Sequence, residues 1–455
     1  MSGAPDRTRA PAPGRVSGLR VPPVRRFALS NGMPVLLIEK HDLPLVALEV
    51  ICPGGAAAVA PARAGLAALT ADMLDEGAGD RSALDFAAAV DRLGATLRSS
   101  AGYDGSHVEL VALRPRLEEG LDLLADLLLR PTFSEHELAR VRQERIDLSL
   151  QLLDEPRSVA NDAFASVLYG PAHPWGPPLL GTRASLAALG RADVAAFHAE
   201  RYHAGNATVV AAGDVTASEL QAMLEARLGA WERRATPTLA LPHAPTVERA
   251  TVHLVDRPGA AQSELRIGRV AVERTSADYF AVTILNTVLG GAFTSRLNHK
   301  LREEKGFTYG AYSGFHTRTA PGPFVAQAAV HTPVTDQAVG VVLEEIERLR
   351  AEPVPADELA RAKSYAALRL PQRFETVGDL VARVGEQVLY DLPDDYWARY
   401  VDGLLAVDAE AVQRAAVTHL DPSHMAVVVD GDRSAVEGPL RALGLPIHHM
   451  PAEAA

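Results

Sequence analysis

The chain has 455 residues, of which 47% are apolar and 22% are charged, a balance typical of a globular protein rather than a disordered or fibrous one. A formal charge of -12 argues against a general nucleic-acid-binding protein, which would carry a basic face or domain. The single cysteine, Cys52, excludes an intramolecular disulfide and fits a reducing, cytoplasmic compartment. At this length, two to four domains are expected.

Residues 1–24 are predicted to form a flexible N-terminal tail. They contain arginines but no apolar core of a secretory signal, and their prolines oppose an amphipathic transit helix. No run of about 18 apolar residues occurs in the chain, which argues against a membrane span.

Regular patterns begin after the tail. Residues 27–40 combine an Asn-Gly turn signal with a strand-like run, and residues 44–52 predict a second strand. Residues 96–114 alternate between apolar and polar and are broken by glycines, as antiparallel strands would be. Helical periodicity predicts helices at residues 62–75, 83–93, 117–129 and 135–153. Strands and helices in blocks indicate an α+β fold.

The chain nearly repeats itself. The tetrapeptide ELAR at 137–140 returns at 358–361, and VLY at 167–169 returns at 388–390. Residues 206–214 are echoed by residues 424–432. Three matches in order at nearly constant spacing predict a duplication.

Two tandem homologous domains follow from this duplication. We expect an N-terminal domain at 25–232 and a C-terminal domain at 251–447, joined by the Pro- and Thr-rich linker 233–250. Each domain is predicted to be a mostly antiparallel sheet with helices packed on one face.

Residues 65–74 read GLAALTADML and are predicted to be helical. On a helix, an HxxEH motif places two imidazoles on one zinc ion and a carboxylate beside its bound water. The stretch resembles the corresponding helix of the inverzincin metallopeptidases, the family of pitrilysin, insulinase and mitochondrial processing peptidase, which typically reads GLAHFLEHML. Ala68, Ala71 and Asp72 stand where that motif has His, Glu and His. Because alanine offers no lone pair, we expect this chain to bind no metal here.

The resemblance places the family's third zinc ligand, a Glu, near Asp147 to Ser149. Without the histidines, Asp147 is interpreted as a polar helix residue. None of the fifteen histidines stands three or four residues from another, so no second helical zinc motif exists. A site assembled from histidines distant in sequence stays open, although surface or core positions are the simpler interpretation.

The second half contains GGAFTSRLNHKLREEKGFTYGAYS at residues 290–313. Its pattern predicts a helix over 293–304, Gly306 as the glycine that follows it, and a strand from Phe307 onward. Arg302 then lies in the last helical turn and Tyr309 is the third strand residue. On this pattern alone, Arg302 caps a helix and Tyr309 packs in a strand.

This segment resembles the second-domain signature of the same family, in which an Arg and a Tyr seven residues later reach the zinc site of the other half or of another subunit. The resemblance implies that Arg302 and Tyr309 bind the peptide backbone and stabilise the tetrahedral intermediate. An always-charged planar donor and a phenol hydroxyl suit an oxygen that becomes negative in the transition state.

The resemblance covers about residues 25–440 and implies a zinc-less subunit of a heteromeric zinc endopeptidase. The zinc would be held by a homologous partner with HxxEH, and an extended peptide substrate would add to a sheet edge. Whether the assembly is a heterodimer, a homodimer or larger stays open. The alternative is a proteolytically inactive scaffold, like the core subunits of the respiratory bc1 complex. An unrelated enzyme using Asp72 or a histidine as a base lacks a converging cluster.

Overall fold

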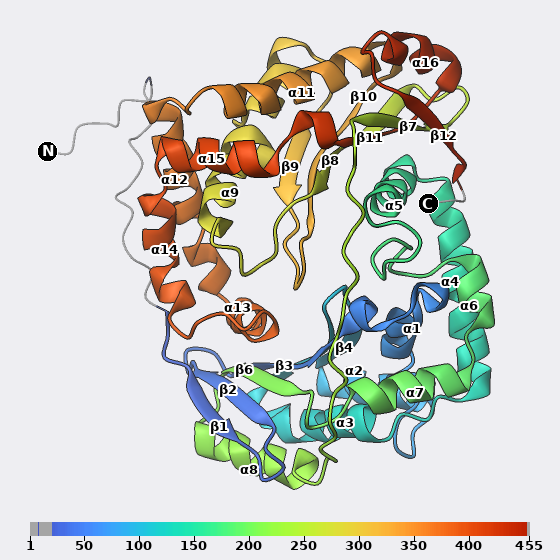
Figure 1. Cartoon of the computed structure of the whole chain (residues 1–455). Coiled ribbons are helices and arrows are strands. Elements are labelled where there is room, and N and C mark those ends of the chain that lie inside the picture. Colours follow the sequence, from blue (N-terminus) through green and yellow to red (C-terminus); the bar gives the residue numbers. More distant parts are fainter. Residues whose placement is uncertain (1–7, 9–20, 453–455) are drawn as a thin grey trace, which may run out of the picture.

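The computed structural model describes Thr8 and residues 21–452, so most of the predicted tail, 1–24, lies outside the described residues. Two six-stranded sheets, one from each half of the chain, form the frame (Figure 1). Strands and helices come in the blocks that the sequence predicts, and the α+β class is confirmed.

The N-terminal half contains six strands and eight α-helices. Its strands are β1 (Arg25–Ala28), β2 (Pro34–Glu39), β3 (Leu45–Pro53), β4 (Thr96–Ala101), β5 (Gly105–Leu113) and β6 (Thr208–Gly213). Its helices are α1 (Leu66–Asp72), α2 (Ala83–Leu93), α3 (Leu117–Leu129), α4 (Glu135–Leu153), α5 (Pro156–Tyr169), α6 (Arg183–Ala188), α7 (Arg191–Arg201) and α8 (Ala217–Leu228).

The C-terminal half repeats this plan after residues 233–249, which contain neither helix nor strand. Its strands are β7 (Thr251–Asp256), β8 (Gln262–Val270), β9 (Ala311–Phe315), β10 (Pro323–His331), β11 (Ala426–Gly431) and β12 (Ile447–Met450). Its helices are α9 (Tyr279–Asn286), α10 (Arg296–Asn298), α11 (Thr335–Ala351), α12 (Ala356–Leu368), α13 (Val377–Leu389), α14 (Tyr396–Ala406), α15 (Ala409–His419) and α16 (Arg433–Arg441). Two π-helical segments, Thr287–Gly291 and His299–Glu304, follow α9 and α10.

Sheet topology confirms the duplication. The order β2-β6-β3-β5-β4 in the first sheet corresponds to β7-β11-β8-β10-β9 in the second. Most neighbouring strands are antiparallel, while β6 runs parallel to β2 and β11 runs parallel to β7. The sequence repeats fall on α4 and α12, on α5 and α13, and on β6 and β11. The sheets differ at one edge, where β1 is antiparallel to β2 but β12 is parallel to β7.

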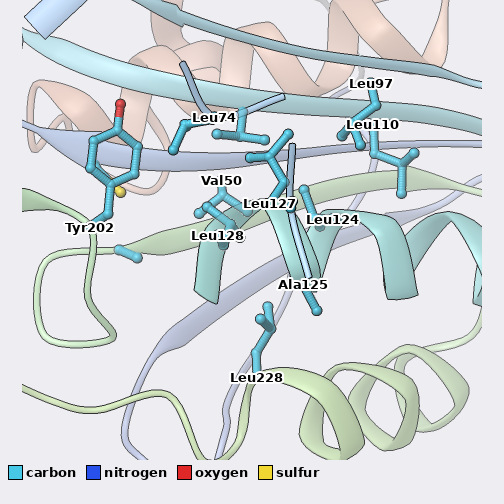
Figure 2. Close-up of a cluster of buried hydrophobic side chains, with 14 of the residues drawn as sticks. Val50, Leu74, Leu97, Leu110, Leu124, Ala125, Leu127, Leu128, Tyr202 and Leu228 are labelled. Atoms are coloured by element: carbon cyan, nitrogen blue, oxygen red, sulfur yellow. The ribbon is translucent and has the colours of Figure 1, made fainter. Parts of the chain in front are cut away.

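The core of the first half lies between its sheet and helices of the same half. Figure 2 shows Leu124, Leu127 and Leu128 of α3 clustered with Val50 of β3, and Ala125 on the side of α3 toward Leu228 of α8. All of these side chains are buried. Because leucines recur along one face of α3, the helix buries a continuous apolar stripe on the sheet.

The opposite face of each sheet carries a helix from the other half (Figure 1). Helix α13 belongs to the C-terminal half but packs on β3 and β6. Its residues Val377, Leu380, Val381 and Val384 share one helical face and contact buried residues of the first sheet. Reciprocally, α5 of the N-terminal half packs on β8 and β11. The two halves are therefore interlocked by exchanged helices.

Polar contacts reinforce this junction at the β9–β10 hairpin. The Arg318 guanidinium lies 3.5 Å from the ring centroid of Tyr103. The buried Asp104 carboxylate accepts hydrogen bonds from the Thr319 hydroxyl at 2.8 Å and the Tyr390 hydroxyl at 3.0 Å. Asp104 belongs to the first half and both donors belong to the second, so these bonds fix the relative orientation of the halves.

We expect Leu380→Ala to lower the free energy of unfolding by about 2–4 kcal/mol, because it removes a buried side chain and leaves a cavity. Although Leu380 lies in the C-terminal half, the lost contacts are with the N-terminal sheet. Urea titration followed by circular dichroism measures the change. Leu84→Ala, at a leucine that is exposed on α2, is the matched control and should shift stability by less than about 0.5 kcal/mol.

By length and composition alone, the stretch Tyr279–Glu304 could cross a membrane. However, 61% of its most apolar window is buried inside the fold, which is typical of a core helix.

Candidate functional site

The helix that resembles the metal-binding helix is shorter than predicted. It spans Leu66–Asp72 instead of 62–75, because Gly65 adopts a φ of 88° and separates it from a 3-10 turn at Pro61–Arg63. A Cβ on Gly65 would lie 2.7 Å from the carbonyl oxygen of Leu180. Glycine is therefore required both by the backbone conformation and by the close approach of the loop before α6.

Two positions of the degenerate motif, Ala68 and Ala71, lie on the buried side of α1. The methyl groups of Ala68 and Ala71 are buried, and the Ser99 hydroxyl of β4 donates a 2.5 Å hydrogen bond to the Ala71 carbonyl. Within the described part of the chain, no group of three or more His, Cys, Asp or Glu side chains is arranged to hold a metal ion. The donor set at α1 does not fit zinc.

Asp72 is instead paired with Arg145 of α4. The Arg145 Nε donates a 2.6 Å hydrogen bond to Oδ2 of Asp72, and its Nη2 contacts the same oxygen. The Arg145 side chain is 9% exposed and that of Asp72 is 40% exposed. Burial raises the pKa of Asp72, and the Arg145 cation opposes that rise. A guanidinium thus supplies the positive charge next to the degenerate motif.

The residues predicted at the third-ligand position do not point to metal binding. Asp147 is exposed and accepts a 2.8 Å hydrogen bond from Gln143 one turn earlier. The Ser149 hydroxyl donates to the Ile146 carbonyl at 2.7 Å. Arg145, one turn before Ser149, is the residue of α4 that pairs with Asp72. Arg145 was not among the residues predicted for the site. Its only signal in the sequence is that it lies four residues before Ser149 and therefore shares a face of α4 with that residue.

His198 and His203 stand five residues apart in the first half, and His198 is half-buried. Burial lowers the pKa of His198 to about 4, and its ring stacks on Tyr202 with centroids 5.1 Å apart. Its Nε2 lies 3.0 Å from the Leu128 carbonyl. His203 is buried.

Asp75 lies just after α1, and burial raises its pKa to about 6. An unfolded aspartate titrates near 3.9, so the native state binds the proton more tightly than the unfolded state. The cost of burying the charge is therefore present at neutral pH and disappears as the pH falls from about 6 to about 4. We expect Asp75→Asn to raise the free energy of unfolding by on the order of 1–2 kcal/mol at pH 7.5 but not at pH 4, measured by urea titration. Asp147→Asn, at an exposed aspartate of α4, is the control and should show no such difference.

The segment with the Arg/Tyr signature differs in part from its prediction. The predicted helix 293–304 begins at Arg296, after Ser295, and its last part, His299–Glu304, is π-helical. Gly306 has a φ of 63° and follows the helix as predicted. The strand was predicted from Phe307 but begins at Ala311. The Thr308 hydroxyl bonds both the amide and the carbonyl of Gly310, which holds the chain in a turn.

Tyr309 therefore precedes the strand and projects into solvent. Its side chain is 87% exposed, and no described residue forms a hydrogen bond with its hydroxyl. The alternative in which Tyr309 packs in a strand is wrong. Tyr309 borders a cavity of about 280 Å³ that lies between the sheet of the second half and the start of α5. The walls of this cavity include Arg157, Glu264, Arg266 and Tyr312.

Arg302 is also accessible. Its side chain is 35% exposed, and its guanidinium lies 4.6 Å from the ring centroid of Phe293, which is itself 60% exposed. Its nearest carboxylate is Glu303, at 3.6 Å from Nε. Among the described residues, no hydrogen bond, ion pair or ring contact joins Arg302 or Tyr309 to α1 or α4.

The chain has two homologous α+β halves, a helix with a degenerate metal-binding motif, and an exposed segment with Arg302 and Tyr309. Together these features define a metallopeptidase-like protein. Residues 34–170 match the model of insulinase (peptidase family M16), and residues 188–365 match that of the peptidase M16 inactive domain. The chain belongs to the M16 peptidase family, as the sequence resemblance predicted.

Relatives and solved structures agree with this assignment. The uncharacterized zinc protease YmxG of Bacillus subtilis is 24% identical over 394 residues, covering 86% of this chain and 95% of the relative. The crystal structure of a peptidase M16 inactive domain from Pseudomonas fluorescens matches with a TM-score of 0.84 and 26% identity, covering 90% of this chain and 98% of that one. A chain of complex III2 from Candida albicans has the same fold, with a TM-score of 0.77 at 14% identity over 94% of this chain and 100% of that one.

Proposed function

We propose that this chain is the zinc-less subunit of a heteromeric zinc endopeptidase that acts on peptides or unfolded segments. Arg302 and Tyr309 act in trans, on a substrate whose scissile bond lies at a zinc ion held by an HxxEH partner. The match to the M16 inactive domain supports a non-catalytic subunit.

The observation that carries the proposal is the contrast between the two halves of the site. Alanines and an Asp–Arg pair occupy the metal half, whereas Tyr309 is exposed with a free hydroxyl and Arg302 stands apart from α1. Substitutions at such an exposed surface position usually change stability little, so Tyr309 is not needed to hold this chain folded. Its hydroxyl is available to an oxygen supplied from outside.

The partner would supply the zinc and its bound water, and the substrate would bind as an extended strand. Within the part of the chain that the structure describes, β4 and β9 end their sheets, so each has one edge without a partner strand. Peptides commonly bind such edges through main-chain hydrogen bonds. A cytoplasmic location is part of the same proposal and rests on the single buried cysteine.

The second candidate is a proteolytically inactive scaffold of the same fold. The Asp72–Arg145 pair favours the scaffold, because it gives Asp72 a structural role that joins α1 to α4 without a metal ion. A scaffold has no use for an exposed Arg302 or Tyr309, which makes the two candidates separable.

Reconstitution tests the proposal. The purified chain and a purified HxxEH homologue are assayed separately and together on an unstructured fluorogenic peptide. We expect hydrolysis by the mixture to exceed the sum of the separate activities, and a mixture without any gain would favour the scaffold.

A further inference from the structure

The C-terminal half contains a polar cavity of about 300 Å³. It lies between α9, the π-helical turn that follows it, β9 and the end of α12, and its walls include Thr283, Asn286, Ser313, Tyr365, Arg369 and Arg373. A cavity of this size accommodates a side chain or a chain end rather than a folded domain.

This cavity lies beside α9, the helix of the second half that corresponds to the degenerate metal helix α1 of the first. In the first half, α1 is flanked by α4 and β4, and Ser99 of β4 bonds to Ala71 of α1. In the second half, α9 is flanked by α12 and β9, and Ser313 of β9 donates a 2.7 Å hydrogen bond to Asn286 of α9. Beside α1 lies the Asp72–Arg145 ion pair, whereas beside α9 lies an open cavity.

The charge of the cavity is entirely positive. Arg369 and Arg373 are its charged residues, and no carboxylate of the described chain lines it. The Arg369 guanidinium lies 4.9 Å from the ring centroid of Tyr365 and donates a 3.0 Å hydrogen bond to the Tyr365 hydroxyl. Among the described residues, neither arginine forms an ion pair, and Arg373 has no side-chain hydrogen bond. Arg369 and Arg373 are both exposed, so an anion in solution can reach them. Two guanidinium groups without a carboxylate partner in the described chain are well suited to an anionic ligand.

Further donors converge on the cavity. The side-chain oxygen Oδ1 of Asn286 accepts the hydrogen bond from the Ser313 hydroxyl. The side-chain nitrogen Nδ2 of Asn286 has no hydrogen-bond partner in the described chain, so it remains available as a donor. Gly290 allows β9 to approach the π-helical turn, since an added Cβ would lie 2.5 Å from the Ser313 amide nitrogen. The backbone thus holds Asn286 and Ser313 in the wall of the same cavity as the arginines.

We propose that this cavity binds a carboxylate of a bound peptide, held by Arg369 and Arg373 with the Asn286 amide as a third donor. The inference rests on the proposed peptide-binding function and adds the substrate feature that the chain recognises. Paired guanidinium donors are well suited to carboxylates because each can donate two parallel hydrogen bonds. Both the C-terminal carboxylate and an Asp or Glu side chain have this chemistry.

The test uses three fluorescently labelled, unstructured peptides of one sequence that lacks Asp and Glu. The first ends in a free carboxylate, the second in an amide, and the third is the amide with one internal Asp. Affinity for the full chain is measured by fluorescence anisotropy at low salt. We expect the free acid to bind about tenfold more tightly than the amide, because a charge-assisted bond is lost in the amide. Tighter binding of the Asp-containing amide than of the plain amide would show that a side chain serves as well.

Arg373→Ala and Arg369→Ala should each remove most of this advantage, and Arg373→Lys should retain part of it. Arg92→Ala is the matched control, because Arg92 is an exposed arginine on α2, outside the cavity. Equal affinity of the three peptides, or an advantage that survives Arg369→Ala/Arg373→Ala, would overturn the inference and leave the proposed function standing. Failure of every peptide to bind, alone or with the HxxEH homologue, would overturn both.

Discussion

Arg302→Ala is expected to lower peptide hydrolysis by the reconstituted pair of subunits by roughly 10²- to 10³-fold. A guanidinium is a planar cationic donor, which can stabilise the oxyanion that forms on the scissile carbonyl. Because Arg302 has little structural role beyond its stacking on Phe293, the loss should appear in kcat and not in the stability of the chain.

Tyr309→Phe should reduce the same activity by roughly 10- to 10²-fold, because it removes one neutral donor and retains the ring. Arg92→Ala, at an exposed arginine far from the signature segment, controls for the loss of a surface charge. Steady-state kinetics with saturating partner subunit separate kcat from KM. Undiminished activity in both Arg302→Ala and Tyr309→Phe would contradict a role in trans and favour the scaffold.

The Asp72–Arg145 pair should show asymmetric costs of truncation. Asp72→Ala leaves the buried Arg145 guanidinium without its counter-charge, and we expect it to lower the free energy of unfolding by about 3 kcal/mol. Arg145→Met should cost less, because the Asp72 side chain is 40% exposed and water can solvate its charge. The double variant Asp72→Ala/Arg145→Met should be more stable than Asp72→Ala alone.

Urea denaturation of the four proteins in this double-mutant cycle measures the coupling energy. Asp147→Asn serves as the control for a change of charge on the exposed face of α4. Equal and small effects of both single variants would show that the pair does not hold α1 against α4.

Local patterns predicted much of the fold. The repeats at 137–140 and 167–169 identified the duplication, because equivalent helices of the two halves keep equivalent contacts. The exchange of α5 and α13 could not be predicted in this way. An amphipathic helix reveals that it has an apolar face but not which sheet that face covers.

The same limit applies to the site. The absence of ligands at Ala68 and Ala71 follows from their side chains alone, and the structure adds only that both are buried. The exposure of Tyr309 depends on a turn made by Thr308, and a strand-like pattern conceals that turn. The pairing of Arg145 with Asp72 joins two residues that are 73 positions apart in sequence, so only tertiary structure shows it.

The central claim is that this polypeptide uses a zinc ion that belongs to its partner. The most direct measurement is the metal content of the purified chain, determined by mass spectrometry alongside its hydrolysis of an unstructured peptide with and without a chelator. We expect no stoichiometric zinc in the isolated chain and no chelator-sensitive hydrolysis until the HxxEH homologue is added. Stoichiometric zinc in the isolated chain, or hydrolysis by that chain which a chelator abolishes, would contradict the account.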